Sequence, residues 1–231
     1  MEISKATKEI NYDLKVINLP KTIDNDIVLT DHSPGYGSAA RFISQATFGA
    51  GRDAKAMGIN SPICIIEVMG RDSGWLAAAS SFYKKNDYDA PHFIGIPEVE
   101  FSEEDFLISI ETSYRNNGYA IAVVAEKIKS KKGILREHQS PKFTDPFGHE
   151  YYESPSKQLS GLVEKTLGVR CRWEKPGTIQ RSLMDSISST DREEAYDIGK
   201  KAIEMSKLEM SEIILSIHRS DQATYEYSIG Y

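Results

Sequence analysis

Short apolar runs alternate along this chain with longer segments in which apolar residues recur at helical spacing. The most continuous runs, at residues 63–68 and 119–125, each predict a buried strand. Weaker runs predict further strands at residues 14–19, 93–96, 169–173, 212–219 and 225–228. Helical patterns lie between them, at residues 2–10, 38–57, 73–85, 102–117, 156–167 and 190–206. This alternation indicates an α/β fold with parallel sheets flanked by helices.

Start and stop signals mark several of the expected helices. Ser102 has the character of an N-cap, and the three acidic residues after it suit the positive end of a helix. Gly58 and Gly118 are typical of helix ends. Residues 127–154 are polar and contain prolines, so we expect a long loop or insertion there. The segment near residues 87–101 is the best candidate for a boundary between two lobes, 1–90 and 91–231. The chain can cross between these lobes more than once.

Composition excludes several classes of protein. The 231 residues are 40% hydrophobic and carry a formal net charge of −6, which supports a real core and argues against a nucleic-acid surface. Lysines gather only at residues 127–132, a run more typical of a solvated loop than of a phosphate-binding patch. We expect no membrane span, because no stretch approaches the ~18 apolar residues that one needs. Cys64 and Cys171 lack the spacing of a disulfide framework or metal site, which favours a cytoplasmic location.

The loop after residues 14–19 carries the strongest chemical signal. Lys21 and Thr22 stand beside the two carboxylates Asp24 and Asp26, and the carboxyl end of a strand is where open α/β sheets bind ligands. One carboxylate can accept a proton while the other holds Mg²⁺ on phosphate oxygens, as phosphoryl transfer requires. The alternative is an Asx-type turn in which both acids cap backbone amides. A calcium loop is disfavoured, because no acidic residue or glycine follows Asp26 at the needed spacing.

A second polar segment follows the strand at residues 63–68. Gly70 lets the backbone approach a sugar closely, and Arg71 can stabilise charge on a transferring phosphoryl group. Alternatives are core packing for Met69 and a helix cap or surface ion pair for Arg71. Glu126 ends the strand at 119–125 and is expected to face the same crevice, unless it is simply solvated.

Both segments resemble signatures of the phosphofructokinase family: Pro20-Lys21-Thr22-Ile23-Asp24-Asn25-Asp26 and Met69-Gly70-Arg71-Asp72-Ser73-Gly74. The resemblance implies Rossmann-like three-layer parallel sheets and transfer of a phosphoryl group to the 1-hydroxyl of fructose 6-phosphate. Asp24 would be the general base and Asp26 the Mg²⁺ ligand, while Met69 and Glu126 would contact the sugar. The first lobe would then carry the catalytic loop and part of the donor site, and the second lobe would bind the sugar phosphate.

Two arginines complete the site that the resemblance implies. Pro176–Ser182 and Thr190–Arg192 are similar to the family's sugar-phosphate region, so Arg181 and Arg192 would clamp the 6-phosphate. Surface salt bridges with Glu193 and Glu194 are the alternative. His32 and His149 are expected to be structural, because Asp24 leaves no need for a histidine base. Glu98 matches an effector position in some relatives, but a plain turn explains it equally well.

The phosphoryl donor is inferred from Lys21. Pyrophosphate-dependent members have lysine at this position, although some ATP users share it, so pyrophosphate is favoured over ATP. Asp145–His149 also resembles the longer pyrophosphate or mixed-donor branch. We expect a homo-oligomer, a dimer or tetramer. Pro62, however, stands where many tetrameric members place an arginine that reaches a neighbour's active site, and this puts that contact in doubt.

The family's Gly-Gly-Asp turn, which helps hold the donor, would precede residue 1. We therefore expect a chain that lacks the first β-α units and stops early at its far end. An exposed sheet edge would then favour aggregation or self-association. The rival functional hypothesis is a noncatalytic sugar-phosphate-binding or oligomerisation module without the donor-binding half.

Overall fold

The computed structural model describes residues 2–132, 135, 141–144, 146, 150–151 and 153–231. It divides the chain into two compact units. Unit 1 comprises Met1–Ser38 and Ile187–Tyr231, and unit 2 comprises Ala39–Ser186. The predicted division near residue 90 falls inside unit 2, because strands on either side of that point pair directly with each other.

A four-stranded parallel sheet forms the centre of unit 2, in the order β3-β4-β2-β7. Every residue of β2 (Ile63–Val68) and β4 (Ala120–Ala125) is buried, as expected for central strands covered on both faces. The edge strands β3 (Phe93–Gly95) and β7 (Cys171–Glu174) are shorter and partly exposed. The continuous apolar runs therefore identified the core of the sheet.

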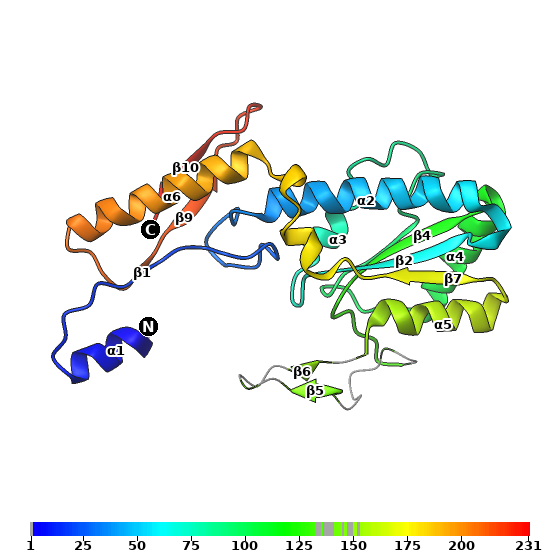
Figure 1. Cartoon of the computed structure of the whole chain (residues 1–231), viewed down its shortest axis with the longest axis horizontal. Helices are drawn as coiled ribbons and strands as arrows, with labels where there is room; N and C mark the ends of the chain where they lie inside the picture. Colours follow the sequence, from blue (N-terminus) through cyan, green and yellow to red (C-terminus); the bar gives the residue numbers. More distant parts are fainter. Residues whose placement is uncertain (1, 133–134, 136–140, 145, 147–149, 152) are drawn as a thin grey trace. The chain divides into compact units, whose positions relative to one another are not determined.

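Helices cover both faces of this sheet. Figure 1 shows α2 (Tyr36–Met57) along one side and α5 (Pro155–Leu167) along the other. In α4 (Glu103–Asn117) the Ser102 hydroxyl accepts the Asp105 N–H, and Gly118 ends the helix at φ 78°, which confirms both signals. The remaining elements are α3 (Trp75–Ala79), β5 (Phe143–Thr144), β6 (Glu150–Tyr151) and the 3₁₀ turns Gly58–Asn60, Gly177–Arg181 and Met184–Ser186.

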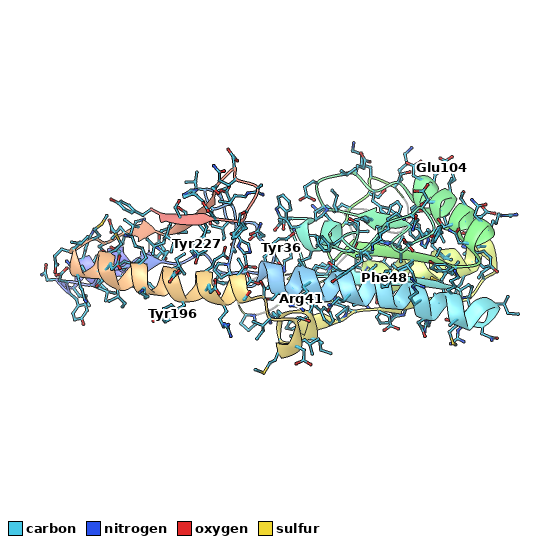
Figure 2. The ribbon with its side chains drawn as sticks, turned by 90° about the horizontal axis from the view of Figure 1, so that it is seen from above. Tyr36, Arg41, Phe48, Glu104, Tyr196 and Tyr227 are labelled. Carbon is cyan, nitrogen blue, oxygen red and sulfur yellow. The ribbon has the colours of Figure 1, made fainter. Side chains whose placement is uncertain are left out.

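Unit 1 is built around α6 (Ser189–Lys207) and the antiparallel pair β9 (Ser216–Arg219) and β10 (Tyr227–Gly230). Its buried core consists of Ile198, Met205, Leu215 and Ile217. Tyr227 and Tyr196 lie on opposite sides of α6 (Figure 2), and the Tyr227 hydroxyl donates to Asp197 of that helix at 2.9 Å. The other elements are α1 (Glu2–Glu9), β1 (Ile17–Asn18) and β8 (Ile213–Ile214), and β1 pairs in parallel with β8.

Several expected elements are shorter in the structure. The strand predicted at 14–19 is reduced to β1, and Leu14 and Leu19 are exposed, because β8 offers only two paired residues. The helix predicted at 73–85 ends at Ala79, after which the backbone forms tighter i to i+3 hydrogen bonds. The strand predicted at 212–219 is divided into β8 and β9, since β8 pairs with β1 whereas β9 pairs with β10.

Candidate functional site

The loop that carries Asp24 and Asp26 has a defined internal structure. The Thr22 hydroxyl accepts the Asp24 N–H at 3.2 Å, and the Asn25 N–H donates to the Thr22 carbonyl at 3.4 Å. Asn25 Oδ1 accepts the Ser33 N–H at 2.8 Å, which ties the loop to the chain ahead of α2. Thr22 and Asn25 therefore contribute hydrogen bonds that stabilise this loop.

The same loop holds two residues in unusual backbone conformations. Thr22 has φ 150° and Asn25 has φ 54°. Asparagine tolerates the left-handed region, but a β-branched threonine with positive φ is strained, and such strain gathers at functional sites. Lys21 and Asp26 are exposed, while Thr22 and Asp24 are half-buried. The loop can thus offer the Lys21 ammonium group to an anionic ligand and the Asp26 carboxylate to a cation.

Unit 2 brings the second group of predicted residues together at the carboxyl end of β2. The Met69 N–H donates to Gln180 Oε1 at 3.1 Å, and the Glu126 N–H donates to the Val68 carbonyl at 3.0 Å. Arg71 Nε lies 3.8 Å from Glu126 Oε1. The side chains of Arg71 and Glu126 are 46% and 25% exposed, so this ion pair is open to solvent. The exposed Arg181 follows Gln180 directly in the chain.

Gly70 is required by the turn between Met69 and Arg71. Its φ is 118°, a conformation that L side chains rarely adopt. A Cβ atom at this position would lie 2.4 Å from the Ser73 carbonyl oxygen. The next glycine is equally confined, because a Cβ on Gly74 would lie 2.5 Å from two carbons of Ile96. Glu98, whose role the sequence left open, accepts the Gly74 N–H at 2.8 Å.

A buried carboxylate supports this segment from inside the sheet. Glu67 is 1% exposed and lies two residues before Met69. It accepts hydrogen bonds from the Ser154 hydroxyl, from Ser156 Oγ at 3.0 Å and from Ser156 N at 3.2 Å, and Lys175 Nζ lies 2.5 Å away. A buried charge needs such partners. The polar residue inside an apolar strand therefore joins β2 to the start of α5 and to the chain after β7.

Unit 1 contains a second buried charged cluster, which the sequence did not reveal. His32 Nδ1 lies 2.6 Å from Glu194 Oε2, and Nε2 lies 3.3 Å from Asp191 Oδ1. Among the described residues, this trio is the group of carboxylate and imidazole side chains close enough to hold a metal ion. No local signal could have found it, because His32 and α6 are far apart in the sequence.

Asp191 also caps the start of α2. Its carboxylate accepts the Gly35 N–H at 3.0 Å and both the N–H and hydroxyl of Ser38 at 2.5 Å. Burial alone would raise the pKa of Asp191, but hydrogen bonds from His32, Ser38 and Gly35 hold it below its ordinary value. Arg192, the next residue, is exposed.

The predicted site residues thus form two sets. Lys21, Thr22, Asp24, Asp26 and Arg192 belong to unit 1, whereas Met69, Gly70, Arg71, Glu126 and Arg181 belong to unit 2. His149 and most of the segment 145–149 lie outside the described residues. In the described part of the chain, no helix is both long and apolar enough to cross a membrane. Both cysteines are buried and unpaired.

Known proteins are similar to this chain in sequence and fold. A pyrophosphate–fructose 6-phosphate 1-phosphotransferase from Halomonas elongata is 31% identical over 230 residues, which are 99% of this chain and 54% of that protein. A sulfofructose kinase from Alkalicoccus urumqiensis is 32% identical over 224 residues, 97% of this chain and 57% of that protein. The chain spans about half the length of the curated relatives it matches.

The structural comparison agrees. The crystal structure of a pyrophosphate-dependent phosphofructokinase from Marinobacter aquaeolei superposes with a TM-score of 0.79 at 33% sequence identity. The match covers 99% of this chain and 54% of that one, and confirms the phosphofructokinase-like α/β fold expected from the sequence. The model of the family described as Phosphofructokinase matches residues 1–206. The chain therefore belongs to the phosphofructokinase family.

Proposed function

We propose that this chain serves phosphoryl transfer from pyrophosphate to the 1-hydroxyl of fructose 6-phosphate, giving fructose 1,6-bisphosphate. The observation that carries the proposal is the loop around Asp24, which has strained backbone at Thr22, is held by Asn25, and places the half-buried Asp24 two residues before the exposed Asp26. A relative that shares this half of its length is named for the same reaction.

Asp24 is the proposed general base. Its carboxylate takes the proton of the 1-hydroxyl while that oxygen forms a bond to the terminal phosphorus of the donor. The bridging P–O bond breaks, and its electron pair leaves on orthophosphate. A half-buried carboxylate suits this role, because part of its surface remains accessible to a bound hydroxyl.

Asp26 fits the requirements of a Mg²⁺ ligand. It is an exposed oxygen donor, and Mg²⁺ commonly takes one or two carboxylates and completes its shell with water and phosphate oxygens. When bound, the ion neutralises charge on the donor phosphates. Lys21 contributes a second positive charge from the same loop and is the reason to favour pyrophosphate over ATP.

The roles in acceptor binding are proposed residue by residue. Arg71 and Glu126 form a solvent-exposed ion pair. The phosphate of a sugar phosphate can therefore bind the Arg71 guanidinium, while Glu126 accepts hydrogen bonds from sugar hydroxyls. Met69 and Gly70 would present the backbone to the sugar. Arg181 and Arg192 are both exposed and are proposed to bind the 6-phosphate. The cytoplasmic location and the homo-oligomer remain predictions.

The first test pairs pyrophosphate and ATP, each with Mg²⁺, with fructose 6-phosphate and with sulfofructose as acceptors. Formation of the phosphorylated sugar is measured, and fructose 6-phosphate binding is followed separately by calorimetry. We expect turnover with pyrophosphate. Turnover with ATP alone would overturn the donor assignment. Activity only with sulfofructose would overturn the acceptor assignment. Binding of fructose 6-phosphate without any turnover would favour the noncatalytic binding module.

A further inference from the structure

His32 lies between two buried carboxylates of α6. The side chains of His32, Asp191 and Glu194 are 16%, 5% and 0% exposed. Because each ring nitrogen faces a different carboxylate, the ring can donate to both only when both nitrogens carry a proton. The arrangement is therefore that of a charged imidazolium enclosed by two anions.

The surrounding groups favour this charged state. Burial alone would lower the pKa of His32, but hydrogen bonds and charge from Asp191 and Glu194 raise the pKa from 6.5 to about 9. From α2, the Tyr36 ring meets the imidazole edge-on at 5.9 Å, and burial raises the pKa of Tyr36. The Tyr225 hydroxyl donates to the other oxygen of Glu194, and burial together with this bond raises the pKa of Tyr225.

The cluster connects two parts of the proposed site within unit 1. On one side, Asn25 accepts the Ser33 N–H at 2.8 Å and donates to the Asp31 carbonyl at 3.4 Å, so the residues flanking His32 hold the Asp24–Asp26 loop. On the other side, Asp191 and Glu194 flank Arg192 on α6. A continuous set of contacts thus runs from the catalytic loop through His32 to the helical turn that carries Arg192.

We propose that His32 is a positioning residue that fixes the Asp24–Asp26 loop relative to Arg192 by bridging Asp191 and Glu194. This inference rests on the proposed function, because it gives Arg192 and Asp24 their roles. A metal ion fits the cluster less well than a proton does. Both oxygens of Asp191 already accept hydrogen bonds from Gly35 and Ser38, and Glu194 accepts one from Tyr225.

The ion pairs of His32 with Asp191 and Glu194 depend on pH. The pKa of His32 is raised in the folded state, so its stabilising effect is complete below about pH 6.5 and is lost as the pH rises through about 9. Between these two pH values, deprotonation removes the positive charge that lies between the two carboxylates. The site should therefore loosen at alkaline pH while the unit remains folded.

The bridge itself is tested by an NMR titration of the His32 ring in the wild-type chain and in Glu194→Gln. We expect titration near pH 9 in the wild type and a pKa at least about one unit lower in Glu194→Gln, which keeps the shape but removes one charge. Amide signals of Asn25 and Arg192 should follow the same transition. The proposal would be overturned by a wild-type His32 pKa near 6.5 or by amide signals of Asn25 and Arg192 that do not change through the transition. Binding of one zinc ion through the ring would overturn it as well.

The effect on the site is tested by calorimetric binding of fructose 6-phosphate from pH 7 to 10. Wild-type affinity should fall roughly 2- to 30-fold through the His32 transition, a range typical of residues that act on a ligand indirectly. In Glu194→Gln the midpoint should move down with the His32 pKa, a shift that a purely structural role does not produce. His32→Gln should bind fructose 6-phosphate weakly at every pH. The control is His218→Gln, which changes an exposed histidine of unit 1 and should bind as the wild type does.

Two outcomes separate this inference from the proposed function. Unchanged affinity in His32→Gln, or an unmoved midpoint in Glu194→Gln, would overturn the positioning role alone. Absence of fructose 6-phosphate binding in the wild type would overturn the proposed function, whereas the NMR titration would still decide whether His32 bridges the two carboxylates and links Asn25 to Arg192.

Discussion

The ion pair between Glu67 and Lys175 allows a quantitative test of how β2 is held. Lys175→Met keeps the aliphatic stem but leaves the Glu67 carboxylate, which is 1% exposed, without its cation. Removing one partner from a fully buried pair costs about 3–5 kcal/mol, and an exposed pair contributes about 0–1 kcal/mol. Lys175 is 44% exposed, and three donors from Ser154 and Ser156 remain. We therefore expect a loss of about 1.5–3 kcal/mol in the free energy of unfolding.

Urea unfolding followed by the fluorescence of Trp173, two residues before Lys175, measures this loss. The matched control is Lys157→Met on α5, which removes an exposed ion-pair partner of Glu153. It should lower the free energy of unfolding by about 0.5 kcal/mol or less. Glu67→Gln combined with Lys175→Met should lose less than the sum of the two single changes, because the unpaired charge is gone. If Lys175→Met were no more destabilising than Lys157→Met, the reasoning about the buried carboxylate would be refuted.

Two further predictions concern the sheet and the turn beside it. Gly70→Ala should destabilise the chain by about 1–3 kcal/mol and weaken fructose 6-phosphate binding, since its φ is 118° and a Cβ would meet the Ser73 carbonyl at 2.4 Å. Thermal unfolding checks this against Gly161→Ala, a helical site with open space, where no loss is expected. Burial raises the pKa of Cys64 to about 12 and also raises the pKa of Cys171, so neither thiol should react with a disulfide reagent at pH 8 before urea is added. Rapid labelling of the native chain would contradict their placement.

The sequence predicted what depends on local patterns. β2 and β4 follow from uninterrupted apolar runs, and the limits of α4 follow from the Ser102 cap and Gly118. These features need only the properties of neighbouring residues. The run at 14–19 misled the prediction because an apolar segment forms a strand only as far as a partner strand extends, and β8 extends for two residues.

The sequence could indicate those candidate site residues that lie in short motifs. Arg71 and Glu126 lie within ion-pair distance, because both follow the carboxyl ends of the paired strands β2 and β4, and their roles toward a ligand stay predictions. His32 was expected to be structural, but nothing near it in the sequence indicates that Asp191 and Glu194 will enclose it. Likewise, Glu67 stands in an apolar run whose neighbours give no sign of Ser154 or Lys175. Such polar contacts between distant segments depend on the completed fold.

The central claim is that Asp24 is the base for phosphoryl transfer. It is tested most directly by comparing Asp24→Ser with Asp13→Ser, which changes an exposed acid of the same unit, in fructose 1,6-bisphosphate formation and in fructose 6-phosphate binding. The account predicts that Asp24→Ser lowers turnover by about 10²–10⁴-fold with nearly unchanged sugar-phosphate affinity, while Asp13→Ser behaves as the wild type. Equal turnover in Asp24→Ser and the wild type would contradict the assignment of the base.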